Sequence, residues 1–179
     1  MGSLRFAGKV WIFGDNIETD ALAPGKYLVL PIEEAATHCL ETLNPLFPSE
    51  VRPGDIIVGG RNFGCGSSRE AAPAALKHLG ISVVLAASFG RIFFRNAIAL
   101  GLPVLACPGI AGTFREGDTA EVDVAAATVR HLGTGVTIAG QPLSEEMLRV
   151  LEEGGVFPMI QRIAREGYGG HMGMAAPRL

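Results

Sequence analysis

The hydrophobic residues in the middle of the chain form short apolar runs that alternate with amphipathic segments. Residues 55–60, 83–87 and 103–107 are largely apolar over lengths typical of buried strands. Between them, residues 69–79 and 92–100 carry apolar side chains at helical spacing, and a glycine follows each segment. The resulting strand–helix–strand–helix–strand order predicts a parallel α/β core with right-handed crossovers.

The two ends of the chain carry other patterns. Residues 10–14 form a further apolar run that ends at a glycine, and residues 33–43 are predicted to form a helix. In the last third, alternating apolar and polar positions predict short antiparallel strands at residues 121–124, 128–131 and 136–138. Ser144 is expected to cap one helix, residues 157–165 to form another, and the Gly- and Pro-containing tail 167–179 to be loose.

The composition excludes several classes of protein. Of the 179 residues, 48% are hydrophobic and 18% are charged, the opposite of the balance in disordered chains. The formal net charge of -3 provides no general basic field for nucleic acid. No stretch approaches the roughly 20 apolar residues of a membrane span, and residues 1–10 lack the apolar core of a signal peptide. We therefore expect no nucleic-acid partner and no membrane partner.

The cysteines and histidines do not have the spacing of a metal site. Cys39, Cys65 and Cys107 are odd in number and include no Cys-x-x-Cys pair, so they predict neither a zinc ribbon nor a self-contained iron–sulfur cluster. The four histidines form no His-Glu-x-x-His motif. Free thiols are typical of a reducing compartment, so we expect a cytoplasmic chain that binds no metal itself.

The most informative chemistry lies in residues 60–70, Gly-Arg-Asn-Phe-Gly-Cys-Gly-Ser-Ser-Arg-Glu. This segment joins a predicted buried strand to a predicted helix, where open α/β sheets bind ligands. Gly64 and Gly66 would let an anion approach the backbone, and the start of a helix favours negative charge. Arg69 can hold a carboxylate with two parallel hydrogen bonds. The segment therefore predicts a site for a small anion.

Other interpretations of this segment compete with an anion site. Ser67 and Glu70 have the spacing of a helix capping box, which needs no ligand. The glycine spacing is not that of a Rossmann motif, and no Walker lysine follows. Ser67 is also a poor base by itself, since a helix end contributes at most about 2 kcal/mol, or roughly 1.5 pKa units. The segment thus predicts half of a site, with the rest expected from a partner chain.

Several motifs occur together in one order along the chain. They are Gly14-Asp15-Asn16-Ile17-Glu18-Thr19-Asp20, Pro24-Gly25-Lys26-Tyr27-Leu28, Asn62-Phe63-Gly64-Cys65-Gly66-Ser67-Ser68-Arg69-Glu70, and Phe93-Phe94-Arg95-Asn96-Ala97 followed by Gly101-Leu102-Pro103. In combination they resemble the small subunits of 3-isopropylmalate dehydratase, the separate-chain form of aconitase's swivelling domain, over about residues 9–165. The resemblance implies a single swivelling β/β/α-type domain, residues 1–179, with a parallel core sheet and short antiparallel strands in its C-terminal third.

The resemblance also implies the missing half of the site. Family members pair with a large subunit whose [4Fe-4S] cluster has one open iron, a Lewis acid for the substrate's hydroxyl and carboxylate. The pair is a hydro-lyase of leucine biosynthesis that interconverts 2-isopropylmalate and 3-isopropylmalate by dehydration and rehydration, as a heterodimer or a higher oligomer. Ser67 matches the base that removes the proton alpha to a carboxylate, and Ser68 and Arg69 match carboxylate-binding positions. The supporting positions implied in the same way are Thr19, Asp20, Gly64 and Gly66.

Residues 27–30, Tyr-Leu-Val-Leu, match the family's substrate-selecting segment, so Tyr27, Leu28 and Val29 are candidate substrate-binding residues. The resemblance implies that homoaconitases place an arginine where Val29 stands, and an arginine would pair with a distal carboxylate. An apolar residue favours an alkyl group instead, because desolvating an unpaired carboxylate is costly. A competing interpretation is that Val29 and Leu30 only pack in a core strand.

Three alternatives concern function. Ala71 stands where family chains commonly carry histidine, which keeps a 2-methylmalate or 2,3-dimethylmalate dehydratase, or a homoaconitase, as the alternative enzyme. The chain could also be a standalone anion-binding module that needs no partner, or a purely structural subunit. Arg91 and Arg95, on the second predicted core helix, could approach the site or a partner, or could lie on a solvated face.

Overall fold

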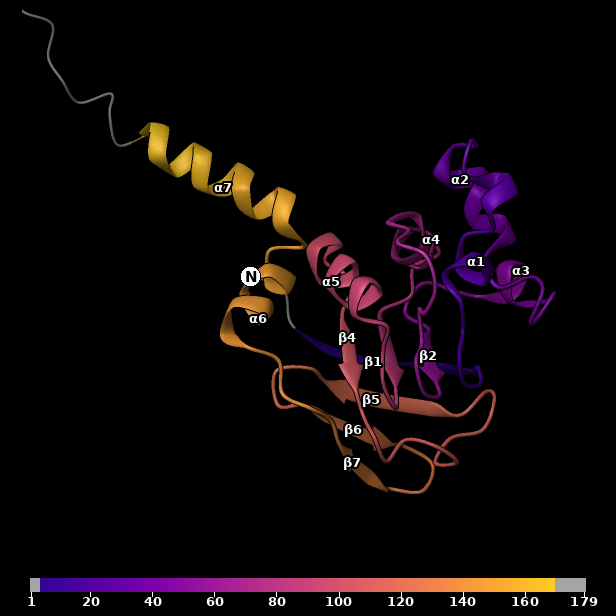
Figure 1. The fold of residues 1–179 in the computed structure, drawn as a ribbon. Coiled ribbons are helices and arrows are strands. Elements are labelled where there is room, and N and C mark those ends of the chain that lie inside the picture. The colour runs from indigo at the N-terminus through magenta and orange to yellow at the C-terminus, as the bar shows by residue number, and fades with distance from the viewer. Residues whose placement is uncertain (1–3, 170–179) are drawn as a thin grey trace, which may run out of the picture.

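The computed structural model describes residues 4–169 and contains one mixed seven-stranded sheet (Figure 1). In chain order the strands are β1 (Arg5–Ile12), β2 (Ile56–Gly59), β3 (Val83–Ala86), β4 (Val104–Ala106), β5 (Thr119–Asp123), β6 (Thr128–His131) and β7 (Thr137–Ala139). Their order in the sheet is β4-β3-β2-β1-β5-β6-β7. Strands β1 to β4 pair in parallel, and β5 to β7 continue from β1 as antiparallel pairs.

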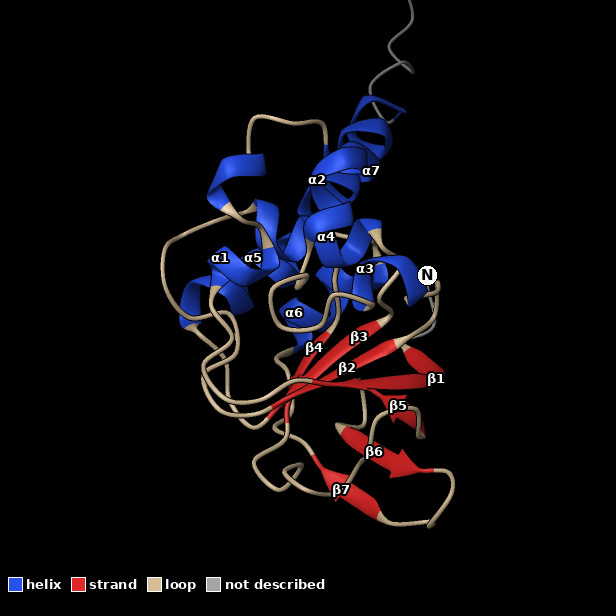
Figure 2. Ribbon diagram, turned by 90° about the vertical axis from the view of Figure 1, so that its right-hand side faces the viewer, coloured by secondary structure: helices blue, strands red, loops and turns tan. Residues whose placement is uncertain are grey.

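Helices lie mainly on one side of the parallel strands, and the antiparallel strands curl beneath them (Figure 2). The helical elements are α1 (Thr19–Leu22), η1 (Gly25–Tyr27), α2 (Ile32–Ala35), η2 (Ala36–His38), α3 (Phe47–Glu50), α4 (Ala71–His78), α5 (Arg91–Leu100), α6 (Glu145–Glu152) and α7 (Val156–Gly169). This arrangement confirms the α/β class, the parallel core and the antiparallel C-terminal strands.

The burial of each strand explains the hydrophobic pattern from which the strand was predicted. Every residue of β2 and β3 is buried, as expected for parallel strands that are covered on both faces. In β5, buried and exposed residues alternate, because one face packs on the core and the other meets solvent. After β7, the N–H of Gln141 donates to the carbonyl of Ala106 at 2.7 Å, so the curled sheet returns to the end of β4.

The helix predicted over residues 33–43 is wrong. The chain forms only the short α2 and η2, after which Leu40 adopts a left-handed backbone with φ of 58°. Cys39 and Leu40 are fully buried, and the N–H of Leu40 donates to the carbonyl of Ala21 at 2.8 Å. Burial of these two residues against α1 therefore overrides the local helical pattern.

The first core helix also differs from its prediction at its start. Helix α4 begins at Ala71 rather than Arg69, and its N-cap residue Glu70 makes no side-chain capping hydrogen bond. The capping-box interpretation of Ser67 and Glu70 is therefore wrong, since Ser67 precedes the helix. The predictions for α5 and α6 are confirmed: the left-handed Gly101 ends the former, and Ser144 caps the latter.

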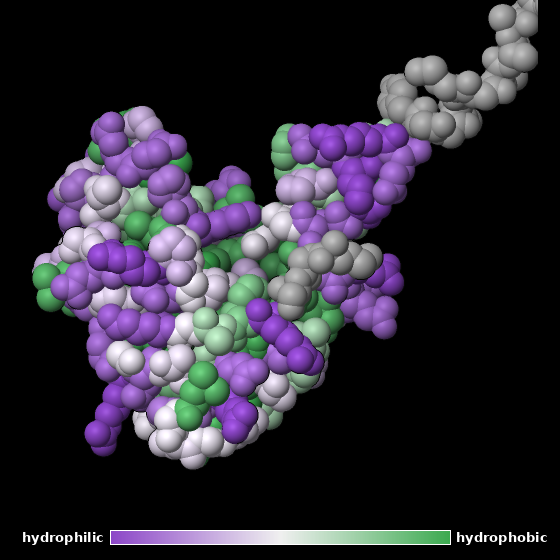
Figure 3. Space-filling model, turned by 180° about the vertical axis from the view of Figure 1, so that it is seen from behind, coloured by the Kyte–Doolittle hydropathy of each residue, from purple (hydrophilic) through white to green (hydrophobic). Residues whose placement is uncertain are grey.

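Helix α7 is longer than the predicted 157–165 and leads away from the body of the molecule (Figure 1). It includes residues 167–169, so these do not belong to a loose tail, and the prediction for residues 170–179 lies outside the described part of the chain. From behind, the edge of α7 turned toward the body is hydrophobic, whereas much of its outer side is hydrophilic (Figure 3). Within residues 4–169, no helix combines the length and the apolar character needed to cross a membrane.

Candidate active site

Two segments run side by side beyond the C-terminal ends of the parallel neighbours β1 and β2. Backbone hydrogen bonds join them, from Asn16 N–H to Arg61 C=O at 2.8 Å, from Gly64 N–H to Ile17 C=O at 2.7 Å, and from Thr19 N–H to Cys65 C=O at 2.8 Å. These bonds extend the pairing of the two strands into the loops that follow. They place residues 60–67 at the sheet edge where α/β folds bind ligands.

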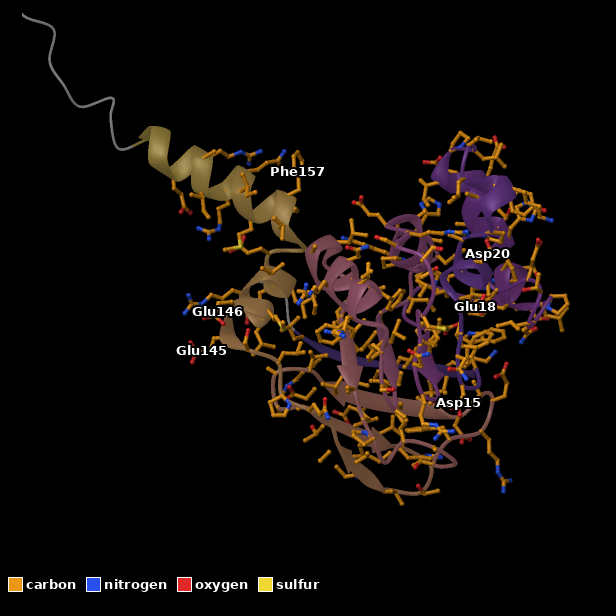
Figure 4. The ribbon with its side chains drawn as sticks, viewed as in Figure 1. Asp15, Glu18, Asp20, Glu145, Glu146 and Phe157 are labelled. Atoms are coloured by element: carbon orange, nitrogen blue, oxygen red, sulfur yellow. The ribbon has the colours of Figure 1, made fainter. Side chains whose placement is uncertain are left out.

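Side chains reinforce this pairing. The guanidinium of Arg61 donates to Asp15 Oδ2 from Nη2 at 3.0 Å and from Nε at 3.2 Å, and Arg61 N–H donates to Asp15 Oδ1 at 2.7 Å. The backbone hydrogen bond, and then the side-chain bonds, hold the pKa of Asp15 below its usual value. Figure 4 shows three acidic residues in succession along the segment after β1: Asp15, Glu18 and Asp20.

Buried phenylalanine rings pack against the site loop at Gly64. Phe63 and Phe93 are almost completely buried, with ring centroids 5.5 Å apart. Gly64 lies directly against this pair with φ of 76°, and a Cβ atom there would stand 2.2 Å from Phe93 Cγ. Packing alone therefore requires glycine at position 64. Gly66 is exposed, and its φ of 96° also favours glycine.

Ser67 and Ser68 lie in the extended link between the two glycines and α4. Both residues are exposed, and neither hydroxyl has a hydrogen-bond partner among residues 4–169. The backbone of Ser67 is nevertheless held, because its carbonyl accepts a hydrogen bond from the buried Thr19 Oγ1 at 2.8 Å. The loop thus presents two available hydroxyls from a fixed backbone.

Arg69 is oriented by contacts to the segment that follows β1. Its Nη1 donates to Asp20 Oδ1 and to the carbonyl of Ala23, the second at 2.8 Å. Asp20 Oδ1 also accepts from Gly25 N–H at 3.1 Å. Nε and Nη2 of Arg69 have no partner in the described part of the chain, so they remain available for a bidentate contact with a carboxylate.

The segment around Tyr27 is held by residues that the sequence did not indicate. The Tyr27 ring stacks on His38 with centroids 3.6 Å apart, and Lys26 Nζ lies 4.5 Å from the Tyr27 ring centroid. His38 Nδ1 is 2.7 Å from Glu41 Oε2. No spacing rule connects Tyr27 with His38, because the chain must turn through α2 and η2 to bring them together.

Leu28 and Val29 are left largely unpacked. Leu28 is 45% exposed and Val29 is 88% exposed, so the interpretation of Val29 as a core strand residue is wrong. Tyr27 and Leu28 line a small apolar cavity together with Ala71, at the start of α4. The remaining lining residues are Ala23, Pro24, Leu30, Ile32, Ala35 and Ala75. An apolar hollow thus lies close to the Arg69 clamp along the chain, while Val29 faces solvent.

On its other side, the site loop meets α5. Arg91 and Arg95 are exposed and line a shallow hollow with the backbone of residues 64–66. Neither arginine has an ion-pair partner among the described residues. Both interpretations of these arginines therefore apply, since they are solvated and also adjacent to the site.

The thiols are separated rather than clustered. Cys39 and Cys107 are buried, and burial raises the pKa of both, that of Cys107 to about 12. Cys65 lies in the site loop and is partly exposed. Across residues 4–169, no group of three or more His, Cys, Asp or Glu side chains is placed to hold a metal ion. The described residues therefore do not fit an iron–sulfur cluster.

Comparisons with known proteins identify the family to which the chain belongs. Residues 41–108 match the aconitase C-terminal domain. The chain is 51% identical over 156 residues to 3-isopropylmalate dehydratase small subunit 1 of Methanopyrus kandleri, which covers 87% of this chain and 92% of that one. The chain belongs to the 3-isopropylmalate dehydratase small-subunit family. It is therefore a lyase subunit of the aconitase type, and membership of a small-subunit family implies a large-subunit partner.

Other members of the family are named for different substrates. The isopropylmalate/citramalate isomerase small subunit of Methanocaldococcus jannaschii is 51% identical over 87% of this chain and 93% of its own. The methanogen homoaconitase small subunit of Methanothermobacter thermautotrophicus is 49% identical over 83% and 86%. The crystal structure of 3-isopropylmalate dehydratase (leuD) from Methanocaldococcus jannaschii superimposes with a TM-score of 0.87 at 35% identity, over 93% of this chain and 99% of that one.

Replacing Gly64 tests the packing beneath the site loop. We expect Gly64→Ala to destabilise the chain by about 3 kcal/mol, because the new methyl group overlaps Phe93 and the positive φ adds strain. Urea unfolding followed by circular dichroism measures the loss. The matched control is Gly112→Ala, since Gly112 has φ of 73° but a Cβ atom there would meet no other atom within 4 Å. Equal losses for the two variants would show that Phe93 does not constrain the loop.

Replacing Asp20 tests the orientation of Arg69. The hydrogen bond from Arg69, and then that from Gly25, lowers the pKa of Asp20. The contact of ionised Asp20 with Arg69 therefore contributes its full stabilisation above the pKa of Asp20 in the unfolded chain, about 4. This stabilisation is lost as the pH falls through the lower pKa of Asp20 in the folded chain. We expect Asp20→Asn to raise KM for the substrate about 10-fold in the enzyme reconstituted with its large subunit, with little change in thermal midpoint.

The control for this prediction is Glu18→Gln, which removes a neighbouring carboxylate that does not contact Arg69. Steady-state kinetics of both variants provide the comparison. An unchanged KM in Asp20→Asn, or an equal rise in Glu18→Gln, would contradict a specific role of Asp20 in positioning the guanidinium.

Proposed function

We propose that this chain is the small subunit of an isopropylmalate isomerase, a hydro-lyase of leucine biosynthesis that interconverts 2-isopropylmalate and 3-isopropylmalate. In one swivel-like domain it supplies a serine base and an arginine clamp to a large subunit. The observation that carries the proposal is the combination at the site loop: Ser67 has a free hydroxyl on a held backbone, and Arg69 has two free donors on an oriented side chain.

The chain's own residues account for binding and for one proton transfer. Arg69, with Ser68 beside it, binds a substrate carboxylate through Nε and Nη2. In its alkoxide form, Ser67 accepts through Oγ the proton from the carbon alpha to that carboxylate while the substrate hydroxyl leaves, and the resulting serine hydroxyl returns the proton during rehydration. A held Ser67 backbone favours this step, because proton transfer needs the acceptor at hydrogen-bond distance from the carbon.

Ser67 cannot become a base through this chain alone. Helix α4 begins at Ala71, so Ser67 does not even receive the modest stabilisation of a helix N-terminus. No basic side chain contacts its hydroxyl within residues 4–169. The proposal therefore assigns the group that stabilises the Ser67 alkoxide to the large subunit. It separately assigns to that subunit a [4Fe-4S] cluster, which would act as a Lewis acid for the leaving hydroxyl.

The segment around Val29 supports an alkylmalate substrate. Leu28 and Val29 are exposed, and Tyr27, Leu28 and Ala71 line an apolar cavity, so an alkyl group finds contacts here that a carboxylate does not. Lys26, the cation of this segment, lies over the Tyr27 ring. These features favour isopropylmalate over a homoaconitase substrate. Citramalate, named in one relative, has a smaller alkyl group that fits the same contacts.

Ser67→Ala tests the proposed base. We expect kcat of the reconstituted enzyme to fall at least about 100-fold, since a general base contributes this much or more to the chemical step. KM should change little, because Arg69 still binds the carboxylate. Isomerisation of 2-isopropylmalate, followed by the absorbance of the unsaturated intermediate and by chromatography of the product, gives both constants.

Two controls accompany this test. Ser49→Ala, an exposed serine on α3, should leave kcat unchanged. Calorimetry on the small subunit alone addresses the standalone anion-binding alternative. Tight binding of an alkylmalate without the large subunit, together with full turnover in Ser67→Ala, would contradict the proposal.

Val29→Arg tests the substrate class. We expect kcat/KM for 2-isopropylmalate to fall about 10-fold or more, and turnover of a substrate with a distal carboxylate to become measurable, because the guanidinium adds a partner for that charge. Val29→Ala is the matched control, since it shortens the side chain without adding charge. A substrate profile that is identical in Val29→Arg and Val29→Ala would remove this residue from substrate selection.

A further inference from the structure

Helix α7 carries an apolar stripe that this chain does not cover. Val156, Phe157, Ile160 and Ile163 recur at helical spacing, and they are 39%, 70%, 57% and 51% exposed. The helix stands away from the sheet, and α5 is its principal packing partner (Figure 1). Phe157 lies at its base, near the end of α5 (Figure 4). A hydrophobic stripe of this kind on a projecting helix is typical of an interaction surface.

Ion pairs hold part of the polar side of α7 within the chain. Arg162 donates to Glu153 at 2.8 Å and to Glu166 at 2.7 Å. A helix of this length has marginal stability in water unless its apolar face is packed. The apolar stripe of α7 remains exposed, and packing it against a hydrophobic partner would stabilise the helix.

This stripe is continuous with the candidate active site. A hollow between α5 and α7 is lined by Asn96, Phe157 and Ile160, and it ends at Glu70, the residue next to Arg69. Toward the start of α5, Arg91 and Arg95 line the second hollow together with Gly64, Cys65 and Gly66 of the site loop. The exposed Ile92 lies beside these two arginines.

We propose that the large subunit docks on this surface, which we call the α5–α7 face and define as Arg91, Ile92, Arg95, Phe157, Ile160 and Ile163. The apolar residues of α7 would be buried in the contact, and Arg91 and Arg95 would pair with acidic side chains of the large subunit. This inference rests on the proposed function, because it identifies the partner with the subunit that completes the Ser67 site.

The position and the charge of the α5–α7 face argue for the large subunit over a second copy of this chain. A partner seated there covers the edge that carries Ser67 and Arg69, and the site needs an activating group from whatever covers it. A second copy brings only the same serine and arginine. In a two-fold dimer the α5–α7 face would meet itself, and none of its six residues is acidic, so Arg91 and Arg95 would find no charge partner in it.

The test is a titration of a fixed amount of large subunit with this chain. Sedimentation velocity gives the Kd, and the rate of 2-isopropylmalate turnover gives the concentration at half-maximal activity. We expect Phe157→Glu combined with Ile160→Glu to raise both values at least about 10-fold, because a buried apolar contact is replaced by charge. Turnover at saturating concentration should stay within about 2-fold of the wild type, since the substituted side chains lie outside the Ser67 loop.

The matched control is Leu132→Glu combined with Val136→Glu, which places the same two charges on exposed residues between β6 and β7, far from α7 (Figure 1). It should change neither value. A second variant, Arg91→Glu with Arg95→Glu, should weaken binding and reduce its dependence on salt, because screening acts on the charge pairs that it removes. Unchanged thermal midpoints of the variants show that each is folded.

The outcomes separate this inference from the proposed function. An unchanged Kd in Phe157→Glu with Ile160→Glu would overturn the docking surface while leaving the role of Ser67 intact. Conversion of a dimer of this chain to a monomer, with an unchanged Kd for the large subunit, would also overturn it and assign the face to self-association. A wild-type complex without turnover would contradict the proposed function, whereas sedimentation would still decide the docking surface.

Discussion

The backbone hydrogen bonds between residues 16–19 and 61–65 are the interaction on which the rest of the site depends. Strands β1 and β2 are parallel neighbours, so the segments after them leave the sheet at the same edge and stay paired. This pairing brings Thr19 to the carbonyl of Ser67, 48 positions away, and Asp20 to Arg69, 49 positions away. Without it, the loop that carries both the serine and the guanidinium would lose its attachment to the segment after β1.

The parts of the fold with a local signal were predictable from the sequence. Strands β2, β3 and β4 are short apolar runs because both faces of a parallel sheet are covered. The end of α5 was equally clear, since Gly101 adopts the left-handed conformation that ends helices. The candidate residues of the site loop were found through their motifs, which depend on order along the chain rather than on contacts.

The contacts that organise the site had no local signal. A polar run after β1 does not reveal that Asp20 and the carbonyl of Ala23 share one nitrogen of Arg69. The stacking of Tyr27 on His38 depends on the path of the chain through α2 and η2, which replace the expected longer helix. The reason for a glycine at position 64 was also only partly predictable from the sequence. Its position in the motif suggests access for an anion, whereas the structure adds a packing requirement from Phe93.

The polar contacts of this chain orient groups, and none of those described activates one. Arg69 uses Nη1 for hydrogen bonds within the chain, and its Nε and Nη2 have no partner among the described residues. Ser67 accepts a hydrogen bond at its carbonyl, whereas its hydroxyl makes none within the described residues. The apolar residues of α7 follow the same logic, because Phe157 and Ile160 remain exposed although burial of such side chains is worth roughly 25 cal/mol per Å². That free energy is not used in folding and remains available for association. In the proposed complex, these exposed apolar residues stabilise the contact with the large subunit. The same contact activates a site that this chain positions but does not activate.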